Sequence, residues 1–326
     1  LHAGTTRNGI ENLVPSPTRM NNATIVRARR HLGDLSRVAE RHQLPLVPAL
    51  AYEVFVRAYS RSSLRMLLRP FFPLRVPSSW LFMAGCYNAG TTVVKNALAM
   101  HPQISTLPVE GDQLTECFRQ FESGGWARCM YANRVHIEES RAAAACCPGQ
   151  VASDWRPWVR TEHALLDKSI SHSVRLAELR SSFPGCQFIV VTRAPEAVVA
   201  GILRRSRPTG TARRSLGANT YPVPLLRRQW AYLYRVILED WRDGDCVMVS
   251  YEAFIANPVD ELSRLFDRLG LSRQSIDFTS DVLRVGSRAM LIRRPDEPLS
   301  ADLISPKVLL DTIAAIELEV PDCLPR

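Results

Sequence analysis

The stretch WLFMAGCYNAGTTVVKNALAMH, residues 80–101, decides the fold. Its first five residues form an apolar run short enough for a buried strand, and GCYNAG at residues 85–90 then predicts a turn. From Thr91 onward the apolar residues recur at helical spacing, so the stretch predicts a strand, a loop and a helix in succession. Such a loop binds phosphate, because free N–H groups and the positive end of the helix dipole point at one place.

The spacing of Gly85 and Gly90 is that of a P-loop, but Thr91 stands where a nucleotide triphosphatase has its lysine. No aspartate at the end of a later apolar strand is an obvious magnesium ligand, so the loop is poorly suited to polarising a γ-phosphate. We therefore predict a phosphate cradle that needs no metal. Its predicted residues are Tyr87, Asn88, Ala89, Gly90, Thr91 and Thr92.

Strands and helices alternate along the rest of the chain. Further strands are predicted at residues 104–107, 164–168, 187–191 and 246–249, and helices at 174–183, 196–205, 225–241 and 259–269. This order predicts an α/β protein, a P-loop-like three-layer fold with a parallel central sheet covered by helices. We assign residues 78–326 to this domain, with a mostly helical insertion at 111–160 and a basic loop at 207–224.

Residues 1–77 lack this alternation and are predicted to be an N-terminal extension, partly disordered and then helical at 23–43 and 48–68. A helical extension packed on the core is the favoured interpretation, and membrane-surface binding by the basic helices is the alternative. The chain begins at Leu1, so the native N-terminus is expected to be incomplete, and no signal-peptide pattern is visible. The longest uncharged run, residues 76–94, fits strand, loop and helix better than a membrane span.

The composition favours an anionic ligand. The 326 residues carry a net charge of +9, and all but three of the 41 basic residues are arginine, the lysines being Lys95, Lys168 and Lys307. The eight cysteines include no C-x-x-C pair, so no zinc site is predicted and a reducing, cytoplasmic location is the simpler interpretation.

Several motifs resemble those of the sulfotransferase family. Asn88-Ala89-Gly90-Thr91-Thr92 is similar to its phosphosulfate loop, which reads roughly (Lys/Arg)-Ser-Gly-Thr-Thr, and FIVVTRAP at residues 188–195 is similar to its buried strand that delivers an arginine. Asp167-Lys168-Ser169 resembles the Glu-Lys-Ser/Thr-Pro segment of carbohydrate and protein sulfotransferases. The segment beginning SYEAF at 250–254 resembles the mainly structural closing segment. Together the motifs span about residues 79–271, in family order.

The resemblance implies that 3′-phosphoadenosine 5′-phosphosulfate (PAPS) is the co-substrate. Arg193 would bind its 3′-phosphate together with a serine eight residues later, but this chain has Gly201 there. A backbone N–H group, Ser206, Arg204 or Arg205 would then substitute. The loop also departs from the family at Asn88, where a lysine or arginine is usual.

The resemblance further suggests catalytic groups. Heparan and tyrosyl-protein sulfotransferases use a glutamate shortly after the second strand, which Glu110 matches, with Asp112 and His101 as alternative bases. A carboxylate suits the role because it must accept a proton as an alcohol attacks sulfur. Lys168 is the best candidate for the positive charge near the leaving oxygen, ahead of Lys95.

We therefore predict metal-independent in-line transfer of a sulfuryl group to a hydroxyl, or to an amine, of a carbohydrate or other small acceptor. The insertion at 111–160 and the loop at 207–224 would shape the acceptor site, where Trp155 and Trp158 would stack on a sugar or serve in packing. The alternatives are a P-loop-like nucleotide-dependent kinase, a non-catalytic nucleotide-binding module and a basic nucleic-acid-binding protein. The last is disfavoured because the arginines are spread along the chain.

Overall fold

A computed structural model describes residues 45–118, 124–132, 134–142, 147–161, 163–272 and 305–319. The chain divides into two compact units, residues 1–55 and 56–326. The helix predicted at residues 23–43 lies outside the described residues.

The larger unit is built on five parallel strands, and the five segments predicted from the sequence form them. They are β1 (Ser79–Gly85), β2 (Ile104–Thr106), β3 (Ala164–Lys168), β4 (Gln187–Thr192) and β5 (Cys246–Ser250). Their order in the sheet is β2-β3-β1-β4-β5, with every neighbouring pair parallel. The predicted α/β fold with a parallel sheet is confirmed.

The order of the strands identifies the edge of the sheet at which a ligand is expected to bind. From β1 the chain forms β2 and β3 on one side of this strand and then crosses to β4 and β5 on the other, which makes the carboxyl end of β1 a switch point between two crossover directions. Ligands of open α/β sheets bind at such points. Gly85, Lys168 and Thr192 end β1, β3 and β4, so the residues that follow them share one edge.

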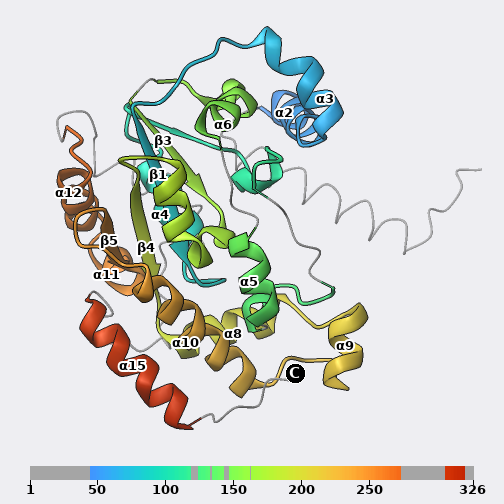
Figure 1. The fold of residues 1–326 in the computed structure, drawn as a ribbon, viewed down its shortest axis with the longest axis vertical. Helices are drawn as coiled ribbons and strands as arrows, with labels where there is room; N and C mark the ends of the chain where they lie inside the picture. The colour runs from blue at the N-terminus through green and yellow to red at the C-terminus, as the bar shows by residue number, and fades with distance from the viewer. Residues whose placement is uncertain are drawn as a thin grey trace, which may run out of the picture. The chain divides into compact units, whose positions relative to one another are not determined.

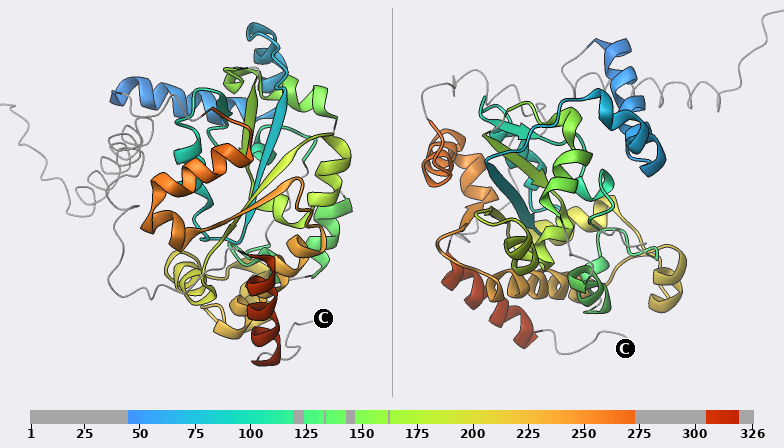
Figure 2. Two further views of the ribbon diagram at one scale, coloured as in Figure 1. Left: turned by 90° about the vertical axis from the view of Figure 1, so that its left-hand side faces the viewer. Right: turned by 45° about the horizontal axis from the view of Figure 1, so that its top comes forward.

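One face of the sheet is covered by aliphatic packing. Helices α4 (Thr91–Leu98), α11 (Tyr251–Ala256) and α12 (Pro258–Arg268) contribute Leu98, Phe254 and other buried side chains to this core. The left view of Figure 2 shows α11 and α12, in orange, in front of the strands. Because both faces of the sheet are buried, the strands are almost continuously apolar, as parallel strands require.

The opposite face is aromatic. Phe82 on β1 packs edge-on against Phe183, with ring centres 5.1 Å apart, and lies 5.0 Å from the ring of His172. This face is next to η5 (Ile170–Val174), α7 (Leu176–Ser182) and α6 (Pro148–Asp154). Figure 1 shows the sheet between α11 and α12 on one side and α5 (Arg134–Ala142) and α6 on the other, which completes three layers.

The remaining long helices are α8 (Pro195–Arg205), α10 (Val223–Glu239) and α15 (Pro306–Glu319). Helix α15 lies along α10 in Figure 1, and ion pairs from Arg227 to Glu319 and from Arg235 to Glu317 join them. Within the described ranges, no helix is long and apolar enough to span a bilayer.

Two sequence predictions differ from the structure. The helix expected at 48–68 is two helices, α2 (Leu46–Tyr59) and α3 (Ser62–Leu68), because Arg61 is extended. The segment 207–224 was expected to be a loop, which is wrong for α9 (Gly210–Leu216). The two glycines that suggest a loop lie at the ends of this helix, and Gly217 caps it in the left-handed conformation.

Candidate active site

The loop between β1 and α4 has an unusual backbone. Gly85, Asn88 and Gly90 have φ values of +149°, +64° and +97°, a region that glycine and asparagine tolerate best. The Gly85 N–H donates to the Ser173 hydroxyl at 2.8 Å, and that hydroxyl donates back to the Gly85 carbonyl at 3.0 Å. The end of β1 is thereby fixed before the chain turns into α4.

Glycine is required at position 90 by the side chain of Tyr251 as well as by the positive φ of the backbone. A β-carbon on Gly90 would lie 2.1 Å from Cδ2 of Tyr251, the first residue of α11. The same ring lies under the guanidinium of Arg193, whose Cζ is 4.4 Å from the ring centre. Tyr251 therefore links the loop to Arg193. No pattern in the sequence predicts this role for Tyr251, which follows the strand predicted at 246–249.

Arg193 lies beside the loop, as the resemblance implies. Its Nη1 donates to the Asn88 carbonyl at 3.1 Å, and its own carbonyl accepts from Nε1 of the buried Trp230 at 2.9 Å. The residue follows β4 directly, so the end of the strand and α10 both hold it. Arg193 and Gly90, which are 103 residues apart in the sequence, thus lie at the same predicted edge of the sheet.

Asn88 is surrounded by positive charge. Its Oδ1 accepts from Nη1 of Arg205 at 3.1 Å and from Nη1 of Arg128 at 3.4 Å. Its Nδ2 is buried and has no hydrogen-bond partner in the part of the chain that the structure describes. A buried donor next to guanidinium groups and the N-terminus of α4 fits an anionic group, so the loop suits the phosphates of PAPS.

The other predicted loop residues lie around this centre. Ala89 and Thr91 are buried, and Thr92 is exposed. Tyr87 stacks on Tyr131 with ring centres 5.9 Å apart. Gly201 is buried in α8 against the side chain of Asn88.

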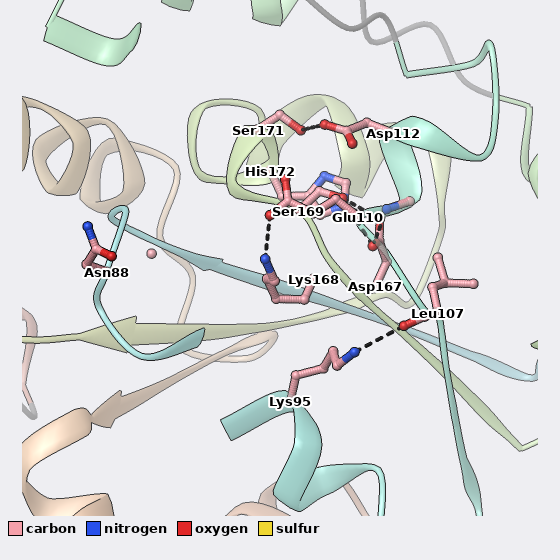
Figure 3. Close-up of polar contacts among 12 residues, drawn as sticks. Asn88, Lys95, Leu107, Glu110, Asp112, Asp167, Lys168, Ser169, Ser171 and His172 are labelled. Carbon is pink, nitrogen blue, oxygen red and sulfur yellow. Dashed lines mark hydrogen bonds and ion pairs between the residues drawn. The ribbon is translucent and has the colours of Figure 1, made fainter. Parts of the chain in front are cut away.

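Glu110 and Lys168 form an ion pair at the same edge of the sheet (Figure 3). Lys168 ends β3, and Glu110 precedes the short helix η2 (Gly111–Gln113) that follows β2. Lys95 instead donates from Nζ to the Leu107 carbonyl at 3.1 Å. Lys168 is therefore the lysine that the structure brings to the predicted base.

A buried carboxylate holds the loop that carries Glu110. Asp167 accepts from the Gly111 N–H at 2.9 Å, from the Ser169 hydroxyl at 3.1 Å, and contacts Nε2 of His172 at 2.6 Å. Burial lowers the pKa of His172, and Asp167 opposes this effect. A β-carbon on Gly111 would lie 2.3 Å from the Asp167 carboxylate, so only glycine permits this approach. Asp167 is part of a recognisable sequence motif, but the network around it joins separate segments and has no signal in the sequence.

Asp112 is a further carboxylate close to Glu110 and Asp167. Burial, and then the charges of Glu110 and Asp167, raise its pKa from 3.8 to about 7. The Ser171 hydroxyl donates to its Oδ2 at 3.0 Å and accepts from the fully buried Arg175 at 2.6 Å. Asp112 therefore titrates near neutrality, next to the predicted base (Figure 3).

Three other candidates are placed elsewhere. Both ring nitrogens of the buried His101 are engaged, Nε2 with the Ser272 carbonyl at 2.7 Å and Nδ1 with the Gln103 N–H at 3.2 Å, so His101 is a packing residue. Of the two roles left open for Trp155 and Trp158, sugar stacking or packing, the structure shows packing. Trp155 is fully buried against Trp80, and Trp158 is 6% exposed and packs on a tyrosine. Across the described ranges, no group of three or more His, Cys, Asp or Glu residues is placed to hold a metal ion.

Comparison with solved structures finds several sulfotransferases. The sulfotransferase domain of the Synechococcus PCC 7002 olefin synthase is 22% identical, with 77% of this chain and 97% of that chain covered and a TM-score of 0.41. A sulfotransferase from Alicyclobacillus acidocaldarius is 16% identical (75% and 96% covered, TM-score 0.41), and STF9 from Mycobacterium avium is 15% identical (82% and 82%, TM-score 0.43). Comparison with curated proteins finds no match.

The family comparison covers the whole of the site described above. The model of the sulfotransferase family matches residues 81–275, more than half of the chain. The matched residues include the loop after β1, the Glu110–Lys168 ion pair and Arg193. The chain therefore belongs to the sulfotransferase family.

Proposed function

We propose that this sulfotransferase moves a sulfuryl group from PAPS to a hydroxyl, or to an amine, of a carbohydrate or other small acceptor. The observation that carries the proposal is the meeting of three features at one edge of the sheet. They are the loop after β1, where the buried Asn88 Nδ2 has no hydrogen-bond partner among the described residues, Arg193 after β4, and the ion pair between Glu110 and Lys168.

The loop and Arg193 would hold the two ends of the donor. Gly90, Thr91 and Thr92, at the N-terminus of α4, would bind the 5′-phosphosulfate, because helix N-terminal N–H groups favour anions. Arg193 would bind the 3′-phosphate. Its cation–π contact with Tyr251 and its hydrogen bond to the Asn88 carbonyl keep its guanidinium beside the loop.

When bound, PAPS supplies a sulfuryl group on a phosphate leaving group. Glu110 would accept the hydroxyl proton of the acceptor as its oxygen attacks sulfur. Once protonated, Glu110 no longer balances the charge of Lys168. The ammonium is then available to stabilise the negative charge that develops on the departing phosphate oxygen. The ion pair thus couples removal of the proton to stabilisation of the leaving group.

Asp167 would be a positioning residue in this mechanism. Its bond to the Gly111 N–H fixes the backbone next to Glu110, and it lies directly before Lys168 on β3. The buried carboxylate therefore holds the backbone beside Glu110 against β3, the strand that ends at Lys168. The described parts of the insertion 111–160 and of the segment 207–224 would contribute to the acceptor site.

The test is calorimetry of the full chain with adenosine 3′,5′-bisphosphate, the donor product, and with ATP plus magnesium. We expect the bisphosphate to bind selectively, because the loop lacks a lysine at Thr91 for a γ-phosphate. Preference for ATP, together with magnesium-dependent turnover, would instead support a kinase.

A further inference from the structure

Two of the positions at which this chain departs from the sulfotransferase pattern, Asn88 and Gly201, lie next to each other. A β-carbon on Gly201 would lie 3.1 Å from Cβ of Asn88 and 3.4 Å from its Cγ. A serine at 201 would therefore crowd the asparagine side chain. Because glycine stands there, the amide of Asn88 occupies space beside α8 that a serine side chain would need.

Three arginines converge on Asn88. Arg205 and Arg128 donate to its Oδ1, and Arg193 donates to its main-chain carbonyl. The two donors fix the amide so that Nδ2 faces away from them, buried and without a hydrogen-bond partner among the described residues. Guanidinium groups that converge on one residue repel one another, so the arrangement favours an anion that accepts from them and from Nδ2.

The backbone of Arg128 is held in place by α10. Arg128 has a φ of +61°, which is uncommon for a residue other than glycine. Its carbonyl accepts from Nε2 of the fully buried Gln229 at 3.0 Å, and Oε1 of the same side chain accepts from the Tyr131 N–H at 3.1 Å. The Tyr221 hydroxyl also donates to the Ala127 carbonyl at 3.1 Å. These bonds fix the segment that presents Arg128 to the donor loop.

The geometry points to a 3′-phosphate site that Asn88, Arg128 and Arg205 complete. Nδ2 of Asn88 takes the place of the missing serine hydroxyl, and the guanidinium groups of Arg128 and Arg205 add positive charge beside it. The phosphate concerned is the 3′-phosphate, because Arg193 and position 201 both contact Asn88. This inference rests on the proposed use of PAPS and names the residues that select a nucleotide carrying a 3′-phosphate.

The structure also distinguishes among the possible substitutes for the missing serine. Arg205 reaches Asn88. Arg204, its neighbour on α8, is exposed and makes no hydrogen bond or ion pair to the loop within the described ranges. Arg204→Gln is therefore a matched control for Arg205→Gln, with the same loss of charge one residue away.

The experiment is calorimetry of the full chain with adenosine 3′,5′-bisphosphate and with adenosine 5′-phosphate. We expect Arg205→Gln and Arg128→Gln each to weaken bisphosphate binding about tenfold or more, as loss of a charge-assisted hydrogen bond does. Binding of the 5′-phosphate should change by less than about twofold, since that nucleotide has no group at the site. Arg204→Gln should match the unaltered chain for both nucleotides.

The inference would be overturned if a variant lost the same affinity for both nucleotides, or if Arg205→Gln lost no affinity for the bisphosphate. In either case the proposed function would stand, provided that the unaltered chain binds the bisphosphate. Failure of the unaltered chain to bind the bisphosphate would overturn both. Arg205 is exposed, so its variant keeps the test decisive even if Arg128→Gln fails to fold.

Discussion

The ring of Tyr251 lies where a side chain on Gly90 would have to be, with Cδ2 2.1 Å from the position of a β-carbon. The two residues come from the first and the last strand-to-helix turns of the sheet, after β1 and β5. Since the ring also contacts Arg193, the packing of one tyrosine sets the distance between the glycine loop and the arginine. A change at Gly90 therefore disturbs both proposed phosphate contacts.

Gly90→Ala should abolish measurable binding of adenosine 3′,5′-bisphosphate and destabilise the fold. The φ of +97° disfavours alanine, and the new methyl group must displace Tyr251. Gly217→Ala is the control, because Gly217 has a φ of +61° but open space around it. We expect the control to lose about 1–2 kcal/mol of unfolding free energy in urea and to keep its affinity. Unchanged affinity in Gly90→Ala would place the phosphates elsewhere.

Arg193→Ala should weaken bisphosphate binding by about 1.5–3 kcal/mol, the range for a hydrogen bond to a charged group. Binding of adenosine 5′-phosphosulfate, which lacks the 3′-phosphate, should change little. Calorimetry with both ligands separates these effects. If both affinities fall equally, the arginine supports the loop through Asn88 and does not bind the 3′-phosphate.

The sequence predicted the parts of this site that short motifs encode. Apolar runs ending in glycine or arginine identified β1, β4 and their ligand edge, because parallel strands carry a strong local signal. Gly90, Arg193, Glu110 and Lys168 do lie at that edge. Their functional roles stay predictions.

Contacts between distant segments could not be predicted in the same way. Arg128 lies in an insertion whose apolar residues show no clear helical or strand period. Its approach to Asn88 depends on Gln229, 101 residues later. The burial of Trp155 is likewise set by Trp80 and Phe118 on separate segments. A pair of tryptophans in sequence gives no sign of which side faces solvent.

Glu110→Gln should lower turnover by about 10²–10⁴-fold, the usual contribution of general base catalysis, while bisphosphate affinity stays within about twofold. Glutamine keeps the side-chain length but cannot take the proton. The measurement is reverse transfer from a generic aryl sulfate to adenosine 3′,5′-bisphosphate. Glu139→Gln, on an exposed position of α5, is the matched control. Turnover close to that of the control would assign the base to Asp112 instead.

Asp112→Asn should raise stability above neutral pH. The folded protein holds the Asp112 proton up to about pH 7, whereas the unfolded chain releases it near 3.8. Between these values the folded state binds more protons, so its unfolding free energy falls as pH rises, by up to about 1.4 kcal/mol per pH unit from this group. Asparagine removes that slope and keeps an oxygen for the Ser171 hydroxyl. Urea denaturation from pH 5 to pH 8 should show the unfolding free energy of the variant rising relative to that of the unaltered chain as pH increases. Parallel curves of unfolding free energy against pH would mean that Asp112 ionises normally in the folded state.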